Sequence, residues 1–174
     1  MKKIILIIAI LFSSVFAEVS VGSKLSTLSL EGDTGGYVAK GMPWSSKMLE
    51  GKTTMLMYVD PDEKSKGEVF KPTIEAFERD LDFNNFQILV ILNLKATWKP
   101  NALISKLVKN KIKDYPKRIY VLDKNSVLVK TWGLKDNAYN TLVIDDKAKV
   151  IYTHSGEWKK GEISEINALI RKLK

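Results

Sequence analysis

The sequence predicts an α/β domain in which a central β-sheet is flanked by helices. An apolar run of strand length, Thr53–Asp60, precedes an apolar series of helical spacing that begins at Phe70. Phe86–Asn93 is apolar nearly throughout, as expected of a strand that is covered on both faces. Glu162–Lys174 has the pattern of an amphipathic closing helix. Strands that alternate with helices in this way are typical of an α/β sheet.

Composition excludes thiol chemistry. The 174 residues contain 28 Lys and Arg, 20 Asp and Glu, and no cysteine, which gives a net charge of +8. Without cysteine the chain cannot form disulfides, use a thiolate nucleophile, cycle a redox thiol or bind a metal through sulfur. The length is sufficient for one domain with a substantial core.

The N-terminus has the pattern of an export signal. Lys2 and Lys3 are followed by the unbroken apolar run Ile4–Phe12, and Val15–Ala17 fits a small-residue cleavage site. The apolar run is shorter than the roughly 20 residues that span a bilayer. We therefore expect residues 1–17 to be a cleavable signal peptide and residues 18–174 to form a single exported domain.

Residues 18–50 are rich in turn formers. Leu25–Leu30 is expected to be an irregular edge strand, and Glu31–Gly36 is expected to be a turn. Ser45 or Ser46 suits the cap of one short helical turn, with Met48 and Leu49 facing inward.

The helix after the central strand has two possible starts. Ser65–Glu68 matches a capping box and favours a start near Lys66. Pro72 would then kink the helix, or would move its start to about Lys71.

The next helix is expected to begin with Pro100 at its first position and to extend to about Lys111. Its apolar stripe is predicted at Leu103, Ile104, Leu107 and Val108.

Two hairpins are predicted before the closing helix. Arg118–Asp123 and Val127–Trp132 flank a short turn, and Thr141–Asp145 and Lys149–Thr153 flank another. Trp132 is expected in the core. The closing helix is expected to turn five apolar side chains inward, namely Ile163, Ile166, Leu169, Ile170 and Leu173.

Local strings resemble the thioredoxin-like fold in its peroxiredoxin and exported-thioredoxin form. Tyr115–Asn125 with Trp132–Leu134 resembles one stretch of those proteins, and Thr141–Asp145 resembles the strand that follows it. The YtfJ family of small exported proteins is similar over essentially the whole mature chain. Its matching pieces are Trp44 with Leu49–Lys52, Ile74–Ala76, Tyr115–Pro116, Trp132–Leu134 and Val143–Lys147. The resemblance implies a periplasmic protein with a thioredoxin-like fold, a central mixed sheet and an N-terminal extension, and no established activity.

The chain departs from a working thioredoxin at the residues that carry the chemistry. Counting back from Pro72, Lys64 and Gly67 stand where the two cysteines would be. The cis-proline of the fold aligns with Tyr139. We therefore expect neither a thiol enzyme nor a bound cofactor, and no catalytic residue is assigned.

The first hypothesis is a non-catalytic binding module that holds an unidentified protein or peptide of the envelope in the old active-site cleft. A groove past the carboxyl end of the central strand is where such folds usually bind ligands. Its candidate residues are Asp60, Asp62, Glu63, Lys64, Lys66, Thr97, Trp98, Tyr139 and Asn140.

Two other interpretations of this loop stay open. Asp60, Glu63 or His154 with a metal would suit a thiol-independent enzyme. Asp60, Asp62 and Glu63 could hold a hard cation or act as an acid/base pair, but adjacent loop acids are usually only solvated. The segment Lys64–Lys66 at a helix start suits an anion, although the nearby acids would repel one.

A basic segment suggests a third function, docking on an anionic surface such as a membrane. The alternative is the solvated side of an amphipathic helix. Nucleic acid is not an expected partner of an exported protein. The segment contains Asp114 as its one acid, and its bases are Lys95, Lys99, Lys106, Lys109, Lys111, Lys113, Lys117 and Arg118.

Trp98 and Trp158 lie in polar segments and are expected to be exposed.

Overall fold

A computed structural model describes residues 18–173. The predicted signal peptide, residues 1–17, lies outside the described residues. None of the helices between residues 18 and 173 combines the length and the apolar character needed to cross a membrane.

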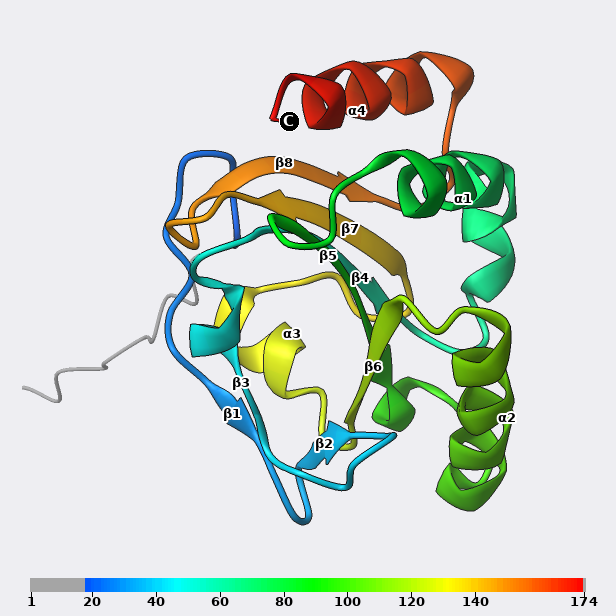
Figure 1. The fold of residues 1–174 in the computed structure, drawn as a ribbon. Helices are drawn as coiled ribbons and strands as arrows, with labels where there is room; N and C mark the ends of the chain where they lie inside the picture. The colour runs from blue at the N-terminus through cyan, green and yellow to red at the C-terminus, as the bar shows by residue number, and fades with distance from the viewer. Residues whose placement is uncertain (1–17, 174) are drawn as a thin grey trace, which may run out of the picture.

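Six strands form one mixed sheet in the order β2-β6-β5-β4-β7-β8 (Figure 1). The inner strands β4 (Thr53–Val59), β5 (Phe86–Asn93) and β6 (Arg118–Asp123) are parallel. The strands β2 (Gly35–Tyr37), β7 (Tyr139–Ile144) and β8 (Val150–Ser155) pair antiparallel with their neighbours. The predicted α/β class, its two inner strands and the β7–β8 hairpin are confirmed.

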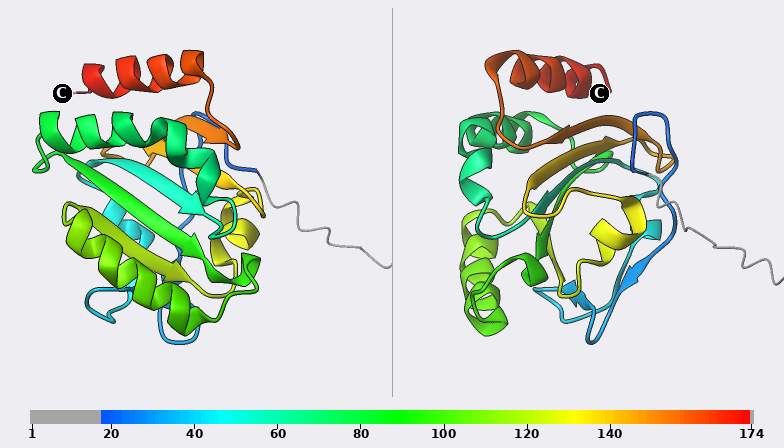
Figure 2. Two further views of the ribbon diagram at one scale, coloured as in Figure 1. Left: turned by 90° about the vertical axis from the view of Figure 1, so that its right-hand side faces the viewer. Right: turned by 180° about the vertical axis from the view of Figure 1, so that it is seen from behind.

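Three helices cover one face of this sheet. They are α1 (Lys71–Asp80), α2 (Asn101–Asp114) and α4 (Lys160–Lys172), which lie across the same side in Figure 2. The helices α1 and α4 pack on β4, β7 and β8 in one apolar cluster, and α2 packs on β6 in another. The 3₁₀ helix η3 (Leu94–Ala96) links β5 to α2.

The opposite face is covered by α3 (Val127–Trp132) and by the N-terminal segment. That segment contains the 3₁₀ helix η1 (Ser46–Leu49) and the separate strand pair β1 (Ser29–Leu30) and β3 (Trp44–Ser45). Ser45 caps η1 and Leu49 is buried, both as predicted. Met48 is exposed, so its predicted inward position is wrong. The predicted turn is confirmed over Glu31–Thr34, where the Thr34 N–H donates to the Glu31 carbonyl at 2.9 Å, and it is shorter than predicted because Gly35 and Gly36 belong to β2.

The segment between β4 and α1 resolves the two possible helix starts. A 3₁₀ helix, η2 (Lys64–Phe70), comes first, and the α-helix begins at Lys71 with Pro72 in its first turn. Proline is tolerated there because its missing N–H has no partner within a first turn. The start near Lys71 is therefore confirmed and the start near Lys66 is wrong.

The predicted strand Val127–Trp132 is wrong, because these residues form α3. The segment Val127–Trp132 is rich in β-branched residues, which favour a strand. The Asp123 carboxylate nevertheless accepts hydrogen bonds from the N–H groups of Val127 and Leu128, and a helix starts there. Gly133, in the left-handed region at φ 65°, ends it. Trp132 is buried as predicted, on a helix instead of a strand.

Several predicted apolar faces are only partly correct. On α2, Ile104 and Val108 are buried, but Leu103 and Leu107 are exposed, and Pro100 is the cap residue before the helix. On α4, four of the five apolar side chains face the core and Leu173 lies beyond the helix, half exposed.

Candidate functional site

Tyr139 occupies the space over the position where a second catalytic cysteine would stand. Its ring lies so close to Gly67 that a Cβ atom at residue 67 would be 2.3 Å from the Tyr139 Cε2 atom. The Tyr139 hydroxyl is 3.1 Å from the Met57 sulfur, and the side chain is buried. Only glycine fits at residue 67 while the tyrosine keeps this place.

Asp60 and Asn140 are buried and support the fold. One Asp60 carboxylate oxygen accepts a hydrogen bond of 2.7 Å from the Ala138 N–H, and Asn140 donates to the carbonyl of Lys135. The other Asp60 oxygen has no hydrogen-bond partner among the described residues. Burial raises the pKa of Asp60 to about 6, and the bond from Ala138 opposes that rise.

Asp62 joins the loop after β4 to the loop before α2. It accepts a hydrogen bond of 2.8 Å from the Thr97 hydroxyl and pairs with Lys99. The Lys99 ammonium and the Thr97 hydroxyl lower the pKa of Asp62. The Trp98 side chain between these anchors is 84% exposed.

Of the other charged residues in the loop after β4, two are paired and one is not within the described part of the chain. Glu63 and Lys66 form an ion pair of 2.6 Å, whereas Lys64 makes no ion pair with any of residues 18–173. The structure therefore does not bring the nine predicted residues into one cleft. Asp60 and Asn140 lie in the interior, Asp62, Thr97 and Trp98 form a loop junction, and Lys64 and Tyr139 line a groove.

That groove lies between η2 with α1 on one side and α2 on the other, and has a volume of about 200 Å³. Apolar side chains of the strands form its floor, among them Met57, Val59, Val90 and Leu92. The helices, the end of α2 and the strands β6 and β7 supply its polar lining, which consists of Lys64, Glu68, Lys71, Lys111, Tyr115, Arg118, Tyr120 and Tyr139. Four cations and one acid thus surround an apolar floor.

Three of these cations gather around the Tyr115 ring. The Arg118 guanidinium carbon is 3.8 Å from the ring centroid, and the ammonium groups of Lys111 and Lys71 are 5.4 and 5.9 Å away. Arg118 also binds Glu78 through two nitrogens, at 2.7 and 2.9 Å. Lys111 has no acidic partner among the described residues, so it and Lys64 are the groove cations available to a ligand. Sequence reasoning assigned Lys111 to a basic face and did not find Tyr115 or Tyr120.

The groups named for the enzymatic alternative, Asp60, Glu63 and His154, have other partners in the structure. His154 stacks on Trp158 at 4.0 Å, on the sheet face covered by α1 and α4. Asp60 follows Tyr58 by two residues and shares its side of the chain, and Tyr58 packs on the opposite face. Within residues 18–173, no three His, Asp or Glu side chains are grouped as metal ligands. The predicted exposure of Trp158 is wrong, because it is buried between Phe70 and His154.

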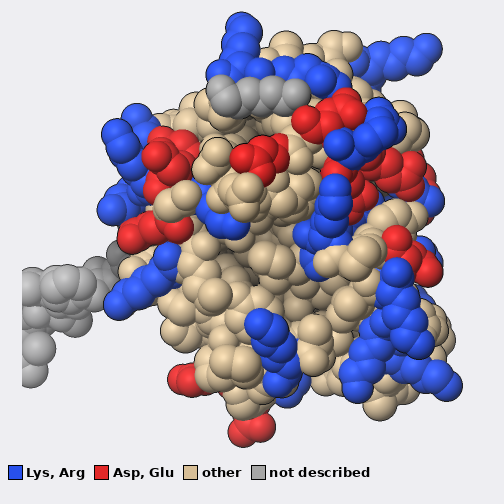
Figure 3. Space-filling model, in the orientation of Figure 1, with Lys and Arg blue, Asp and Glu red and all other residues tan. Residues whose placement is uncertain are grey.

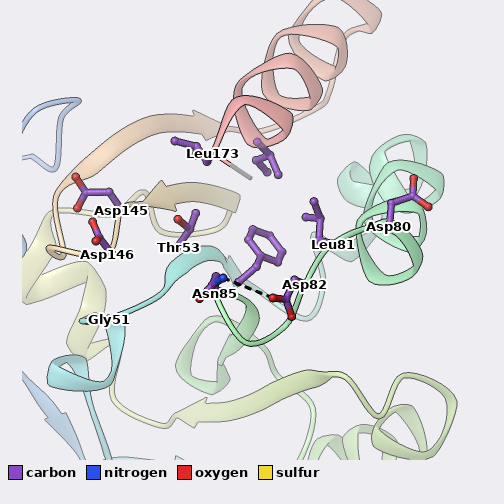
Figure 4. A pocket seen from close by; sticks show the side chains of 11 residues that line it. Gly51, Thr53, Asp80, Leu81, Asp82, Asn85, Asp145, Asp146 and Leu173 are labelled. Atoms are coloured by element: carbon purple, nitrogen blue, oxygen red, sulfur yellow. Dashed lines mark hydrogen bonds between the residues drawn. The ribbon is translucent and has the colours of Figure 1, made fainter.

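A larger cavity, of about 610 Å³, lies at the opposite end of the central strands, where β4 and β5 begin (Figure 4). Four aspartates line it, but three already have partners. Asp80 pairs with Arg171, Asp82 accepts from the Asn84 N–H, and Asp145 accepts from two N–H groups of its own turn. These acids stabilise local structure, and the groove remains the better candidate site.

Sequence comparison matches a family model described as "Bacterial protein of unknown function (YtfJ_HI0045)" over residues 13–173. The "Uncharacterized protein YtfJ" of Escherichia coli (strain K12) is 26% identical over 133 residues, which are 75% of this chain and 71% of that protein.

Solved structures of similar fold are thioredoxin-like. An exposed lipoprotein thioredoxin of Streptococcus pneumoniae strain TIGR4 has a TM-score of 0.61 at 17% identity, covering 83% of this chain and 99% of that one. The thioredoxin domain of a thiol-disulfide oxidoreductase from Bacteroides vulgatus gives 0.60 at 13% identity, covering 90% and 100%. A 2-Cys peroxiredoxin of Plasmodium vivax gives 0.55 at 14% identity, covering 87% and 96%. At these identities the likeness shows the fold alone.

Proposed function

Because the chain belongs to the bacterial YtfJ_HI0045 family and has a thioredoxin-like fold without cysteine, we propose that it is an exported binding module that performs no thiol chemistry. Its ligand is an acidic peptide segment of an envelope protein, bound in the groove between η2 and α2. The observation that carries this proposal is the contact of Tyr139 with Gly67, which fills the redox position and leaves an apolar groove with two unpaired cations beside it.

Export is supported by the N-terminal sequence. Lys2 and Lys3, the apolar run Ile4–Phe12 and the site at Ala17 have the order of a cleavable signal. The fold is also that of an exposed lipoprotein thioredoxin. Protein purified from the envelope should have the mass of a chain that begins at Glu18. A mass that includes residues 1–17 would contradict cleavage.

The absence of thiol catalysis follows from composition. A nucleophilic thiolate is required to attack a disulfide or to carry a thiol redox cycle, and the chain contains no sulfur other than methionine. Purified protein should neither reduce an insulin disulfide nor consume peroxide. Turnover of either substrate by a pure sample would reject the proposal.

The groove suits a peptide that carries both an apolar and an acidic side chain. Met57, Val59 and Leu92 offer an apolar surface to the first, and Lys64 and Lys111 can each donate to a carboxylate at the rim. A neutral apolar ligand would leave two ammonium groups near its surface without compensation, so the charge favours an acidic one.

Photocrosslinking in intact cells tests this assignment. A photoreactive residue at position 64 should capture a discrete partner, and Lys111→Glu in the same chain should abolish that capture. The matched control is the same photoreactive residue at the exposed position 147, in the turn between β7 and β8. Equal capture from both positions, or capture that Lys111→Glu does not change, would contradict a specific groove.

A further inference from the structure

The most exposed large apolar side chain among the described residues is held on an anchored loop. Trp98 is 84% exposed, while Thr97 and Lys99 on either side both bind Asp62. The Lys99 N–H also donates to the Thr97 hydroxyl, at 3.3 Å. The backbone is therefore fixed at both neighbours of the indole, and the ring does not lie against the core.

The helix that follows presents two further apolar side chains to solvent. Leu103 and Leu107 are 47% and 50% exposed and lie one turn apart, so they share one stripe of α2. The core-facing stripe of the same helix contains Ile104 and Val108. Neither of the two cavities described above is lined by Trp98, Leu103 or Leu107, so these side chains protrude from the surface.

Lysines accompany the exposed leucines along the helix. Lys106, Lys109 and Lys113 have the spacing i, i+3, i+7 of a single stripe, and none makes an ion pair with any of residues 18–173. Blue side chains gather at the lower right of Figure 3, where Figure 1 places α2. A cationic stripe beside protruding apolar groups is typical of helices that lie in a bilayer interface.

We propose that α2 and the loop before it dock on a membrane surface that contains anionic lipid. Trp98, Leu103 and Leu107 enter the boundary between headgroups and acyl chains, where indole rings are favoured. Lys106, Lys109 and Lys113 pair with lipid phosphates. A bilayer accepts protruding apolar side chains without a matching pocket, and the lysine stripe supplies the charge complementarity that selects anionic lipid.

Tryptophan emission tests this proposal directly. Trp44, Trp132 and Trp158 are buried and residues 1–17 contain no tryptophan, so a change of environment at the surface is reported by Trp98. The probe is a vesicle of phosphatidylglycerol and phosphatidylcholine, compared with one of phosphatidylcholine alone. We expect a blue shift, and quenching by brominated acyl chains, only with the anionic vesicle. Both should weaken at 1 M salt, where screening extends only about 3 Å.

Variants separate the apolar and electrostatic contributions. Trp98→Ala should lower vesicle affinity by about tenfold. The triple variant Lys106→Gln, Lys109→Gln, Lys113→Gln should lower it by about fivefold per lysine. The matched control removes three exposed lysines elsewhere, Lys40→Gln, Lys147→Gln and Lys172→Gln, and should retain most of the affinity. All variants are compared with the same N-terminus, as verified by mass.

Three outcomes would overturn the proposal. The first is an emission spectrum that anionic vesicles leave unchanged, and the second is an equal loss of affinity in the two triple variants. The third is self-association, seen as a dimer in sedimentation that Trp98→Ala abolishes while vesicles do not bind, because the surface would then join two copies of the chain.

Discussion

The two faces of the sheet use their polar groups in opposite ways. On the α3 face, the Asp123 carboxylate accepts four hydrogen bonds, from the Tyr58 hydroxyl and from the N–H groups of Asn125, Val127 and Leu128. On the α2 face, Lys64 and Lys111 line a groove and have no acidic partner among residues 18–173. Polar groups that the fold has already paired are unavailable to a ligand, so proximity to a strand end does not by itself identify a site.

The largest expected effect on stability comes from a substitution on the α3 face of the sheet. Asp123→Ala should lower the free energy of unfolding by about 3 kcal/mol or more, because it leaves four donors, two of them buried and two partly buried, without their acceptor. Urea unfolding measures the loss. Asp123→Asn keeps the shape and part of the acceptor capacity, and should recover some stability. A loss below about 1 kcal/mol in the alanine variant would mean that the network is not structural.

The contact between Gly67 and Tyr139 should give the next largest effect. Gly67→Ala should destabilise the protein by about 1–3 kcal/mol, because the new methyl group overlaps the ring. The cost should fall in a Tyr139→Leu background, as a double-mutant cycle measures.

Gly161→Ala is the matched control for that cycle. A Cβ at residue 161 has open space, and alanine favours the α4 helix, so this change should be neutral or stabilising. Equal costs at residues 67 and 161 would contradict the packing described for Tyr139.

The buried carboxyl of Asp60 should make stability depend on pH. Its pKa is raised to about 6, so the folded chain holds this proton more tightly than the unfolded chain does. The stabilisation that the folded state gains from protonated Asp60 is therefore complete below about pH 4 and is lost as the pH rises to about 6. The loss in the free energy of unfolding is on the order of 2 kcal/mol. Asp60→Asn should remove this part of the pH dependence. If the difference in unfolding free energy between the two proteins is the same at pH 4 and pH 7, the pKa is not raised.

The smallest effect on stability is expected in the groove. Lys64→Gln and Lys111→Gln should each change the free energy of unfolding by no more than about 0.5 kcal/mol, because neither lysine has a paired charge to lose. Circular dichroism melts of the two variants measure this. A large loss in either variant would show that its lysine supports the fold and would weaken the contrast between the two faces.

Much of the fold could be predicted from the sequence because hydrophobic periodicity reports burial. The strands β4 and β5 and the β7–β8 hairpin are where apolar runs predicted them. The helix α3 could not be predicted from its β-branched composition, because it depends on a side-chain cap from Asp123. A local pattern does not contain that information.

The candidate site was less predictable, for a related reason. The loop after β4 was correctly located, but the direction of each side chain depends on contacts with distant residues. Asp60 turns inward to Ala138 and Tyr139 covers Gly67, neither of which sequence spacing shows. Trp158 lies in a polar segment and is buried because Phe70 and His154 stack on its ring.

The proposal that the groove is a binding site is tested most directly by blocking it. Since the chain contains no cysteine, Glu68→Cys provides a single attachment point for an uncharged thiol reagent in the groove while keeping Lys111, and Lys147→Cys provides one far from it in sequence. We predict that labelling residue 68 abolishes partner capture from position 64, whereas the unlabelled Glu68→Cys protein and the protein labelled at residue 147 still capture the partner. Undiminished capture by the protein labelled at residue 68 would contradict the account.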